Sequence, residues 1–255
     1  MSRIFITGSS TGLGLMAGQL LAEQGHRVVL HARSDARAGE TQRALPEAEA
    51  VVVGNLTTIA GMRAVAEAAN RLGRFDAVIH NAAVGYREQR RETEDGLPHV
   101  FAINALAPYV LTALMERPAR LVYLSSGMHH GARLHLDDLT WKKRRWSGSE
   151  AYAESKLHNV LLAFAIARLW PDVSSNALEP GWVPTRMGGT GAPDDIDQAH
   201  RTQAWLAAGD DPKARVTGHY FFHMRRRDPN PETHDVGLQD GLMEAFAKFS
   251  GVRLA

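Results

Sequence analysis

The sequence of 255 residues contains no cysteine. Disulfides, zinc–thiolate sites, iron–sulfur clusters and cysteine nucleophiles are therefore excluded together. The chain also lacks any apolar run that approaches the ~20 residues needed by a membrane-spanning helix. Its formal net charge is only +1, so no overall field favours nucleic acid or an anionic membrane as a partner.

Positive charge gathers in two short runs, residues 142–145 and 225–227. The rest of the chain balances these runs, and solvated loop charge explains them better than a nucleic-acid interface does. The first ten residues lead directly into an expected strand and a glycine loop, without the pattern of a signal peptide. We therefore expect a cytoplasmic protein that binds neither nucleic acid nor membranes.

Short apolar runs alternate with helix-period segments over the first two thirds of the chain. The expected strands are almost continuous in Val, Ile, Leu and Phe, which is typical of strands covered on both faces. This alternation predicts an α/β fold, a doubly wound parallel sheet of the Rossmann type with about seven strands and helices on both faces. Strands are expected at residues 4–7, 27–30, 50–53, 75–80, 120–124, 174–178 and 218–223, and helices at 13–24, 36–44, 59–72, 97–115, 151–169 and 238–249.

No internal repeat or low-complexity linker divides the chain, so residues 1–255 are interpreted as one domain. The segment 181–212 is rich in Gly, Pro and Asp, a composition typical of a mobile loop with at most short helices. We expect this segment to cover the substrate as a lid, with Gly188, Gly189 and Gly191 allowing movement.

A glycine-rich loop joins the first expected strand to the first expected helix. Glycine lets the backbone turn sharply and approach a pyrophosphate, while the helix N-terminus offers unpaired N–H groups and a positive dipole end. Three hydroxyl side chains add possible donors. This context favours a dinucleotide site over a turn without a ligand. The loop consists of Gly8, Ser9, Ser10, Thr11, Gly12, Leu13 and Gly14.

The end of the second expected strand indicates which dinucleotide binds. An acidic residue there would bind the ribose 2′-hydroxyl, whereas an arginine accommodates a 2′-phosphate. Here the strand runs into Ala32, Arg33 and Ser34, and the first carboxylate is Asp35. Arg33 can bind the phosphate with Ser34 donating beside it, so NADP(H) is favoured over NAD(H). The alternative is a surface arginine without a ligand.

Tyr152 and Lys156 lie four residues apart on an expected helix, so their side chains share a face. Free tyrosine has a pKa of ~10. A nearby ammonium group, together with the positive nicotinamide of the oxidised cofactor, would lower that pKa towards the range of general acid–base catalysis. Such a pair arises often by chance, so its significance depends on the surrounding motifs.

With those motifs the sequence resembles the short-chain dehydrogenase/reductase family over nearly its whole length. It has TGxxxGxG at residues 7–14, a variant of the family's NNAG at 80–83, a serine pair at 125–126, YxxxK at 152–156 and PGxVxT at 180–185. The resemblance implies a catalytic tetrad of Asn104, Ser126, Tyr152 and Lys156.

In that family the tyrosine donates the proton, the serine holds the carbonyl oxygen, the lysine binds the nicotinamide ribose, and the asparagine fixes a water that links the lysine to solvent. Ser126 is preferred to Ser125 because the family's catalytic serine is usually the second of the pair. Hydride addition builds negative charge on oxygen, so two donors there, Ser126 and Tyr152, would stabilise the transition state.

The resemblance also implies further contacts to the cofactor. Asn55 stands where many members have an aspartate that binds adenine, Ala83 replaces the last glycine of NNAG, and Ala107 replaces a glycine common after Asn104. These departures affect cofactor affinity rather than the proton path. Besides the glycine loop, Arg33, Ser34, Tyr152 and Lys156, the implied cofactor residues are Asn55, Leu56, Asn81, Ala82, Ala83, Pro180, Gly181, Val183 and Thr185.

The interval between Ser126 and Tyr152 is longer than in most members. With LDDL at 136–139 and SKLHNVLL at 155–162, it resembles the retinol dehydrogenase and WW-domain oxidoreductase branch and bacterial ketoreductases related to it. That resemblance implies a medium-sized apolar ketone, aldehyde or alcohol as the small-molecule substrate. Apolar and aromatic side chains line most such sites. The candidate pocket residues, each of which has a core or surface location as its alternative, are Gly85, Tyr86, Met128, Trp146, Trp182 and Met187.

Two further questions stay open in the sequence. His129 and His130 lie near Ser126, but no carboxylate cluster has metal-ligand spacing, so no metal site is expected. A catalytically idle NADP(H)-binding sensor is the alternative function, although intact Ser126, Tyr152 and Lys156 favour an enzyme.

Family members commonly form dimers or tetramers through the helix bearing Tyr and Lys and its neighbour. A homo-oligomer is thus compatible with the sequence, but the long interval before Tyr152 would obstruct this contact.

Overall fold

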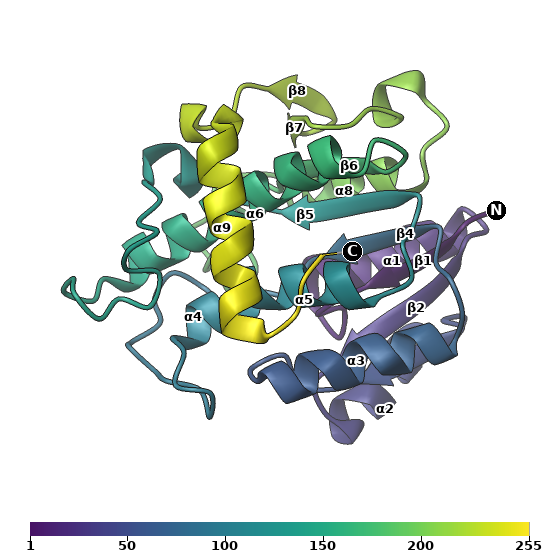
Figure 1. Ribbon diagram of the computed structural model, residues 1–255. Coiled ribbons are helices and arrows are strands. Elements are labelled where there is room, and N and C mark those ends of the chain that lie inside the picture. The colour runs from purple at the N-terminus through teal and green to yellow at the C-terminus, as the bar shows by residue number, and fades with distance from the viewer. Residues whose placement is uncertain (255) are drawn as a thin grey trace.

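The computed structural model describes residues 1–254, and an eight-stranded sheet forms its centre (Figure 1). The strands are β1 (Arg3–Ile6), β2 (Arg27–Ala32), β3 (Ala50–Val53), β4 (Ala77–His80), β5 (Arg120–Leu124), β6 (Ser174–Glu179), β7 (Tyr220–Phe222) and β8 (Arg225–Arg227). Their order across the sheet is β3-β2-β1-β4-β5-β6-β7-β8. All neighbours are parallel except β7 and β8. The predicted α/β doubly wound sheet is confirmed.

The strand order reverses between β1 and β4. From β1 the chain builds outward to β3, then returns to β4 on the other side of β1 and continues to β8. Such a switch point opens a crevice at the carboxyl ends of the parallel strands, where ligands of these folds bind. In Figure 1 β5 runs from right to left, so this edge of the sheet faces the left-hand side.

Helices cover both faces of the sheet. They are α1 (Gly12–Glu23), α2 (Asp35–Ala44), α3 (Ile59–Arg71), α4 (His99–Phe101), α5 (Ala107–Leu114), α6 (Gly148–Leu169), α7 (Ile196–Ala199), α8 (Arg201–Ala208) and α9 (Val236–Ser250). A π-helical turn, η1 (Ala102–Leu106), joins α4 to α5, and short 3₁₀ turns are η2 (Gly127–Gly131), η3 (Pro212–Ala214) and η4 (Pro231–His234). Helices α1 and α8 pack on one face, and α3, α5, α6 and α9 pack on the other (Figure 1).

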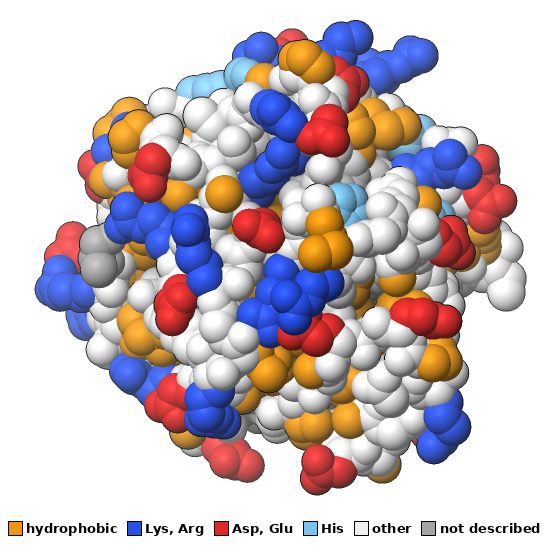
Figure 2. Space-filling model, turned by 90° about the vertical axis from the view of Figure 1, so that its right-hand side faces the viewer, with side chains coloured by type: hydrophobic (Ala, Val, Ile, Leu, Met, Phe, Trp, Pro, Cys, Tyr) orange, Lys and Arg blue, Asp and Glu red, His pale blue; other side chains and the backbone are white. Residues whose placement is uncertain are grey.

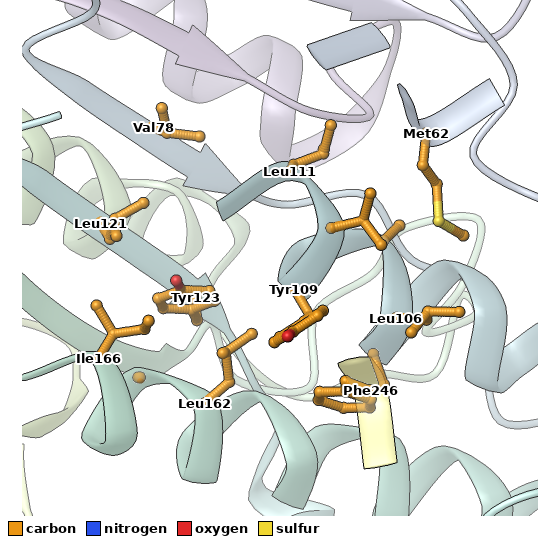
Figure 3. Close-up of a cluster of buried hydrophobic side chains, with 14 of the residues drawn as sticks. Met62, Val78, Leu106, Tyr109, Leu111, Leu121, Tyr123, Leu162, Ile166 and Phe246 are labelled. Carbon is orange, nitrogen blue, oxygen red and sulfur yellow. The ribbon is translucent and has the colours of Figure 1, made fainter. Parts of the chain in front are cut away.

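Alternate residues of each strand enter the two layers of the core. Ile4 and Ile6 belong to the cluster under α1 and α8, whereas Phe5 between them belongs to the cluster under α3 and α6. The second cluster is the larger one, and Figure 3 shows Tyr109 of α5 and Phe246 of α9 within it. Their ring centroids lie 5.2 Å apart. Helix α9 therefore returns the C-terminal part of the chain to the core.

Helix α6 is central to the molecule. It begins after Ser147, whose Oγ accepts a hydrogen bond from the backbone N–H of Glu150, and it ends at Leu169 before Pro171, which cannot continue a helix. Residues 151–166 are all buried, because the sheet lies on one side of the helix and α9 on the other. This environment fixes the orientation of any side chain that α6 contributes to a site.

Two elements differ from the sequence-based expectation. Residues 225–227 form an eighth strand that pairs antiparallel with β7 and exposes all three arginines. A charged edge strand has no apolar pattern to reveal it. Within the segment 181–212, where at most short helices were expected, residues 201–208 form α8, whose position was not predicted and which buries Ala204, Leu206 and Ala207 against the sheet. Buried Thr202 and Gln203 within α8 conceal its apolar character.

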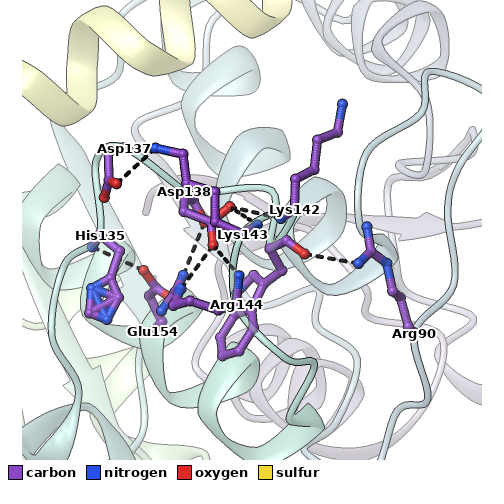
Figure 4. A network of polar contacts seen from close by, with 9 residues as sticks. Arg90, His135, Asp137, Asp138, Lys142, Lys143, Arg144 and Glu154 are labelled. Carbon is purple, nitrogen blue, oxygen red and sulfur yellow. Dashed lines mark hydrogen bonds and ion pairs between the residues drawn. The ribbon is translucent and has the colours of Figure 1, made fainter.

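The segment before α6 is fixed by a polar network (Figure 4). The Asp138 carboxylate accepts hydrogen bonds from the backbone N–H groups of Lys142 and Lys143 at 2.7 and 3.1 Å. The Arg144 guanidinium bridges Asp138 and Glu154, both of which are buried. The basic run is therefore only partly solvated, since Arg144 turns inward and connects this segment to α6.

The surface agrees with the balanced charge of the sequence. Figure 2 shows the face at the right-hand side of Figure 1, where Lys and Arg side chains are interspersed with Asp and Glu and no broad patch of one sign forms. Among residues 1–254, every helix is too short or too polar to cross a membrane.

Candidate active site

The glycine loop lies at the switch point, packed closely against the chain that follows β4. Gly8 has φ +62°, and a Cβ atom there would lie 2.6 Å from the Cα atom of Ala82. A Cβ atom on Gly14 would lie 2.4 Å from Nδ2 of Asn81. Both glycines are therefore required by the close approach of two backbone segments, as well as by any approach of a ligand.

The segment expected to resemble NNAG supports this loop through hydrogen bonds. Nδ2 of Asn81 donates to the carbonyl oxygens of Thr7 and Gly8, both at 3.0 Å. In return Thr7 Oγ accepts from the backbone N–H groups of Asn81 and Ala82, again at 3.0 Å. The predicted cofactor residues Asn81 and Ala82 thus hold the loop in place. Ala83 follows them, half-buried.

The N-terminus of α1 is open to an anion. Thr11, its N-cap residue, is exposed and makes no side-chain capping bond, and Gly12 is exposed as well. Its free N–H groups and dipole suit a pyrophosphate. Ser9 was expected to add a hydroxyl, but it is fully buried, and its Oγ donates to the Ile6 carbonyl and accepts from the His31 backbone N–H, both at 2.8 Å. The exposed hydroxyl nearest the helix N-terminus is therefore that of Thr11, with Ser10 half-buried beside it.

The end of β2 presents Arg33 to solvent. Among residues 1–254 no carboxylate pairs with its guanidinium, so the side chain is available to an anionic group. Ser34 beside it caps α2, accepting a hydrogen bond from the backbone N–H of Arg37. After the neighbouring strand β3, Asn55 is exposed, whereas the Leu56 side chain belongs to the core and leaves only its backbone for a ligand.

Tyr152 and Lys156 lie on the second and third turns of α6, with their side chains close together. The Lys156 ammonium lies 5.5 Å from the centre of the Tyr152 ring and donates to the Leu124 carbonyl at 2.9 Å. Burial raises the pKa of Tyr152 to about 12, and the hydrogen bond with the Ser126 side chain opposes this shift. Burial also lowers the pKa of Lys156 to about 7. The expected depression of the tyrosine pKa is not found, because burial is the largest influence on the Tyr152 pKa and outweighs the hydrogen bond with Ser126.

The two serines after β5 have different environments. Ser125 is buried, and its hydroxyl donates to the Lys156 carbonyl at 2.8 Å. Ser126 is half-buried, and its Oγ accepts a bond from the Met128 N–H and interacts with Tyr152. Only Ser126 can donate towards a group in front of the tyrosine, which supports the predicted choice between the pair.

Asn104 is fully buried in the π-helical turn η1. Its Oδ1 accepts from the Val84 N–H at 2.8 Å, and its Nδ2 donates to the Val84 carbonyl at 3.0 Å and to Ser155 Oγ at 3.1 Å. Single π turns inside helices occur frequently at functional sites. This one connects the loop after β4 with α6, one residue before Lys156.

The loop after β6 carries the residues expected at the nicotinamide. Gly181 has φ +89°, and a Cβ atom there would lie 2.8 Å from the Asp194 carboxylate. Val183 is buried, and Thr185 Oγ accepts from the Gly188 N–H at 3.2 Å. Pro180 precedes them at the end of β6, half-buried. All four predicted residues lie on one turn beside the carboxyl end of the sheet.

Predicted substrate residues gather in front of Tyr152. The Met187 sulfur lies 3.9 Å from the Tyr152 hydroxyl, and the Tyr86 ring meets the Tyr152 ring edge-on at 6.0 Å. A Cβ atom on Gly85 would lie 2.9 Å from Cγ of Met187. Three of the predicted residues are also among the large apolar side chains exposed to solvent, namely Met128, Trp182 and Met187.

Trp146 lies elsewhere. Its indole N–H donates to the Glu88 carbonyl at 3.2 Å, and its ring packs on Trp141 at 5.5 Å. His129 is likewise structural, since its Nδ1 bonds to the Ser126 carbonyl and its Nε2 accepts from the Asn230 N–H. Among residues 1–254 no three His, Asp or Glu side chains form a group able to hold a metal ion.

Two residues near the site were not predicted. Ser155 connects Asn104 to the Tyr152 carbonyl, and His31 contacts Gly8. Ser155 lies within an expected helix, and His31 directly follows an expected strand. The one signal in the sequence that could have revealed them is a polar residue within a run expected to be buried.

A glycine loop at the switch point and a Tyr–Lys pair at the same edge of the sheet define a nicotinamide-dependent oxidoreductase. A family model described as enoyl-(acyl carrier protein) reductase matches residues 8–216. The uncharacterized oxidoreductase AN7799 of Emericella nidulans is 44% identical, over 99% of this chain and 98% of that protein. The chain belongs to the short-chain dehydrogenase/reductase family.

Other relatives confirm the predicted resemblance within the family. DnrU of Streptomyces sp., whose name describes a daunorubicin C-13 ketoreductase, is 33% identical over 97% of this chain and 92% of its own. Retinol dehydrogenase 13 of Mus musculus is 28% identical over 99% of this chain and 84% of its own.

Solved structures share the fold. An uncharacterized protein from Mycobacterium paratuberculosis superimposes with a TM-score of 0.86 at 24% identity, over 100% of this chain and 95% of that chain. A metagenomic blue fluorescent protein in complex with NADPH gives a TM-score of 0.68 at 21% identity, over 86% and 95%.

Proposed function

We propose that this protein is an NADP(H)-dependent carbonyl reductase or alcohol dehydrogenase acting on a medium-sized apolar ketone, aldehyde or alcohol. One observation carries the proposal. The hydroxyl of Tyr152, protonated at neutral pH, lies beside Ser126 and one helical turn from Lys156, at the edge of the sheet where the glycine loop lies.

The chain's own residues fit the cofactor. Gly8 and Gly14 bring the backbone close to the open N-terminus of α1, which suits a pyrophosphate. Ala32 ends β2 where an acidic residue would favour NAD(H), and Arg33 is free to bind a 2′-phosphate. The NADPH bound by a structural neighbour is consistent with this preference. When bound, the cofactor supplies the hydride.

Tyr152 and Ser126 then act on the carbonyl oxygen. As the carbonyl carbon is reduced, negative charge develops on the oxygen, and both hydroxyls can donate hydrogen bonds to it. The Tyr152 O–H bond breaks and its proton goes to the oxygen, giving the alcohol. With its pKa raised by burial, Tyr152 holds this proton at neutral pH.

Lys156 and Asn104 support the tyrosine. The Lys156 ammonium lies 5.5 Å from the centre of the Tyr152 ring, where its charge would stabilise a phenolate. Because burial brings the pKa of Lys156 to about 7, this group can exchange a proton near neutrality. Asn104 holds the backbone of Val84 at the front of the site through two hydrogen bonds.

The substrate class follows from the groups around the tyrosine. Met128, Trp182 and Met187 expose apolar surface, and Tyr86 lies against the Tyr152 ring. The Met187 sulfur contacts the Tyr152 hydroxyl at 3.9 Å, so we expect the turn that carries Met187 to be the part of the proposed lid that moves when a carbonyl oxygen binds there. The relative named as a ketoreductase supports a ketone as the reacting group.

The test is a panel of apolar ketones and aldehydes assayed by NADPH oxidation, with Tyr152→Phe as the matched variant. Loss of the proton donor should lower kcat by about 10²–10⁴-fold. The Kd for NADPH should remain within about twofold, because the variant keeps the ring and Lys156. Equal turnover by both proteins would refute the mechanism. Cofactor binding with no turnover by wild type on any member of a broad panel would favour an NADP(H)-binding sensor.

A further inference from the structure

His31, at the carboxyl end of β2, is buried, with 3% of its surface exposed, yet both of its ring nitrogens bind loops of the cofactor site. Nδ1 accepts a hydrogen bond from the backbone N–H of Gly8 at 3.0 Å. Nε2 lies 2.9 Å from the carbonyl oxygen of Gly54. The imidazole therefore spans the distance between the glycine loop after β1 and the loop after β3.

The partners determine which nitrogen carries the proton. The Gly8 N–H is a donor, so Nδ1 must offer a lone pair. The Gly54 carbonyl is an acceptor, so Nε2 must carry the hydrogen. Only the neutral ring with hydrogen on Nε2 satisfies both groups. The His31 backbone adds two bonds, since its N–H donates to Ser9 Oγ at 2.8 Å and its carbonyl accepts from the Ser9 N–H at 3.2 Å.

Gly8 depends on this contact. It has φ +62° and lies so close to Ala82 that no side chain would fit, and its N–H group points to the interior rather than to the ligand side. His31 is the acceptor for that N–H, and without it a backbone donor at the turn would be unpaired. The other end of the ring holds Gly54, immediately before Asn55, which faces the expected adenine position.

We infer that His31 is a positioning residue for the dinucleotide, which fixes the glycine loop through Gly8 and sets its spacing from the loop at Gly54 and Asn55. The inference rests on the proposed function. His31 touches neither the cofactor nor the reacting atoms, and its effect is on affinity for the cofactor. The pyrophosphate and the adenosine half of the dinucleotide bind to different loops, and the imidazole keeps these loops in register before the cofactor arrives.

Three variants separate the two hydrogen bonds. In His31→Asn the side-chain oxygen can replace Nδ1 and accept from Gly8. In His31→Gln the amide N–H can replace Nε2 and donate to Gly54. His31→Leu provides neither. Val29→Ala is the matched control, because Val29 is buried on the same strand and its truncation lowers stability without touching either loop.

The Kd for NADPH is measured by ligand fluorescence below the melting range of every variant, and kcat and the carbonyl KM are measured at saturating NADPH. We expect His31→Leu and His31→Gln to bind NADPH at least about tenfold more weakly, and His31→Asn to recover most of the affinity. Saturating kcat and the carbonyl KM should stay within about twofold in all three. Val29→Ala should keep the wild-type Kd although its Tm falls.

Wild-type affinity in His31→Leu would overturn the inference, as would a loss of affinity in Val29→Ala equal to that in His31→Leu. Rescue by glutamine instead of asparagine would also overturn it, because the bond to Gly8 would then be without effect. Failure of the wild-type protein to bind either NADPH or NADH would instead overturn the proposed function, and with it this inference.

Discussion

Arg33→Ala tests whether this protein distinguishes NADPH from NADH by one guanidinium group. A hydrogen bond to a charged partner contributes about 1.5–3 kcal/mol. Arg33 is exposed, and water screens its interaction with a phosphate, so we take the lower half of that range. About 1.5–2 kcal/mol corresponds to roughly 10- to 30-fold in Kd. NADPH should therefore bind about 10- to 30-fold more weakly, while NADH, which lacks the phosphate, should bind as before.

The assay is a pair of titrations, NADPH and NADH, followed by cofactor fluorescence for each protein. Arg37→Ala is the matched control, since Arg37 is a surface arginine of the neighbouring helix α2 whose guanidinium pairs with Glu40 at 2.7 Å. It should leave both affinities unchanged. If Arg33→Ala weakened both cofactors equally, or neither, the assignment of the 2′-phosphate to Arg33 would be refuted.

Gly14→Ala should lower the Tm by roughly 4–10 °C in a calorimetric scan, because the added Cβ would lie 2.4 Å from the Asn81 amide and displace it from two hydrogen bonds. Gly131→Ala is the control and should change the Tm little, since a Cβ atom there would have no atom within 4 Å. Lys156→Met should abolish turnover but raise the Tm at pH 7. Burial lowers the pKa of Lys156 from 10.5 to about 7, so between these pH values the unfolded chain binds one more proton than the folded chain, and wild-type stability increases with pH. The difference in Tm between Lys156→Met and wild type should thus shrink towards pH 10. A Tm difference that stays constant with pH would contradict the lowered pKa of Lys156. Because α9 packs over α5 and α6, copies of the chain should not associate through these two helices. Chemical cross-linking should therefore give no cross-links between copies on α5 or α6, and such cross-links would contradict this.

The sheet was predictable because most of its strands have long apolar runs. Residues 50–53 and 121–124 are continuously apolar, and the strands observed at 50–53 and 120–124 have the predicted bounds. The eighth strand escaped prediction because three exposed arginines contribute only backbone pairing at the edge. The position of helix α8 within the segment 181–212 was not predicted, because its buried Thr202 and Gln203 interrupt the apolar period and its flanks are rich in Gly, Pro and Asp.

Candidate site residues could be chosen from the sequence where the residue type and its position between expected elements allow few structural roles. Glycines between a strand and a helix, and a tyrosine four residues before a lysine, are patterns of this kind, and the structure shows close packing around Gly8 and Gly14 and Lys156 beside the Tyr152 ring. Contacts that depend on side-chain direction were not predictable. Ser9 turns into the core, and Trp146 turns towards Glu88, because packing of distant segments decides these orientations. The raised pKa of Tyr152 could not be inferred either, since it arises from burial.

The burial of residues 151–166 in α6 separates the parts of this protein that must stay constant from those that are free to vary. Tyr152 and Lys156 lie in this buried stretch, where most substitutions would cost stability. Met128 is exposed on the 3₁₀ turn η2 and Trp182 on the loop after β6, where exchanges cost little. A lineage, or an engineer, can therefore alter the surface around the proposed site by a few substitutions on these segments while Tyr152 keeps its geometry.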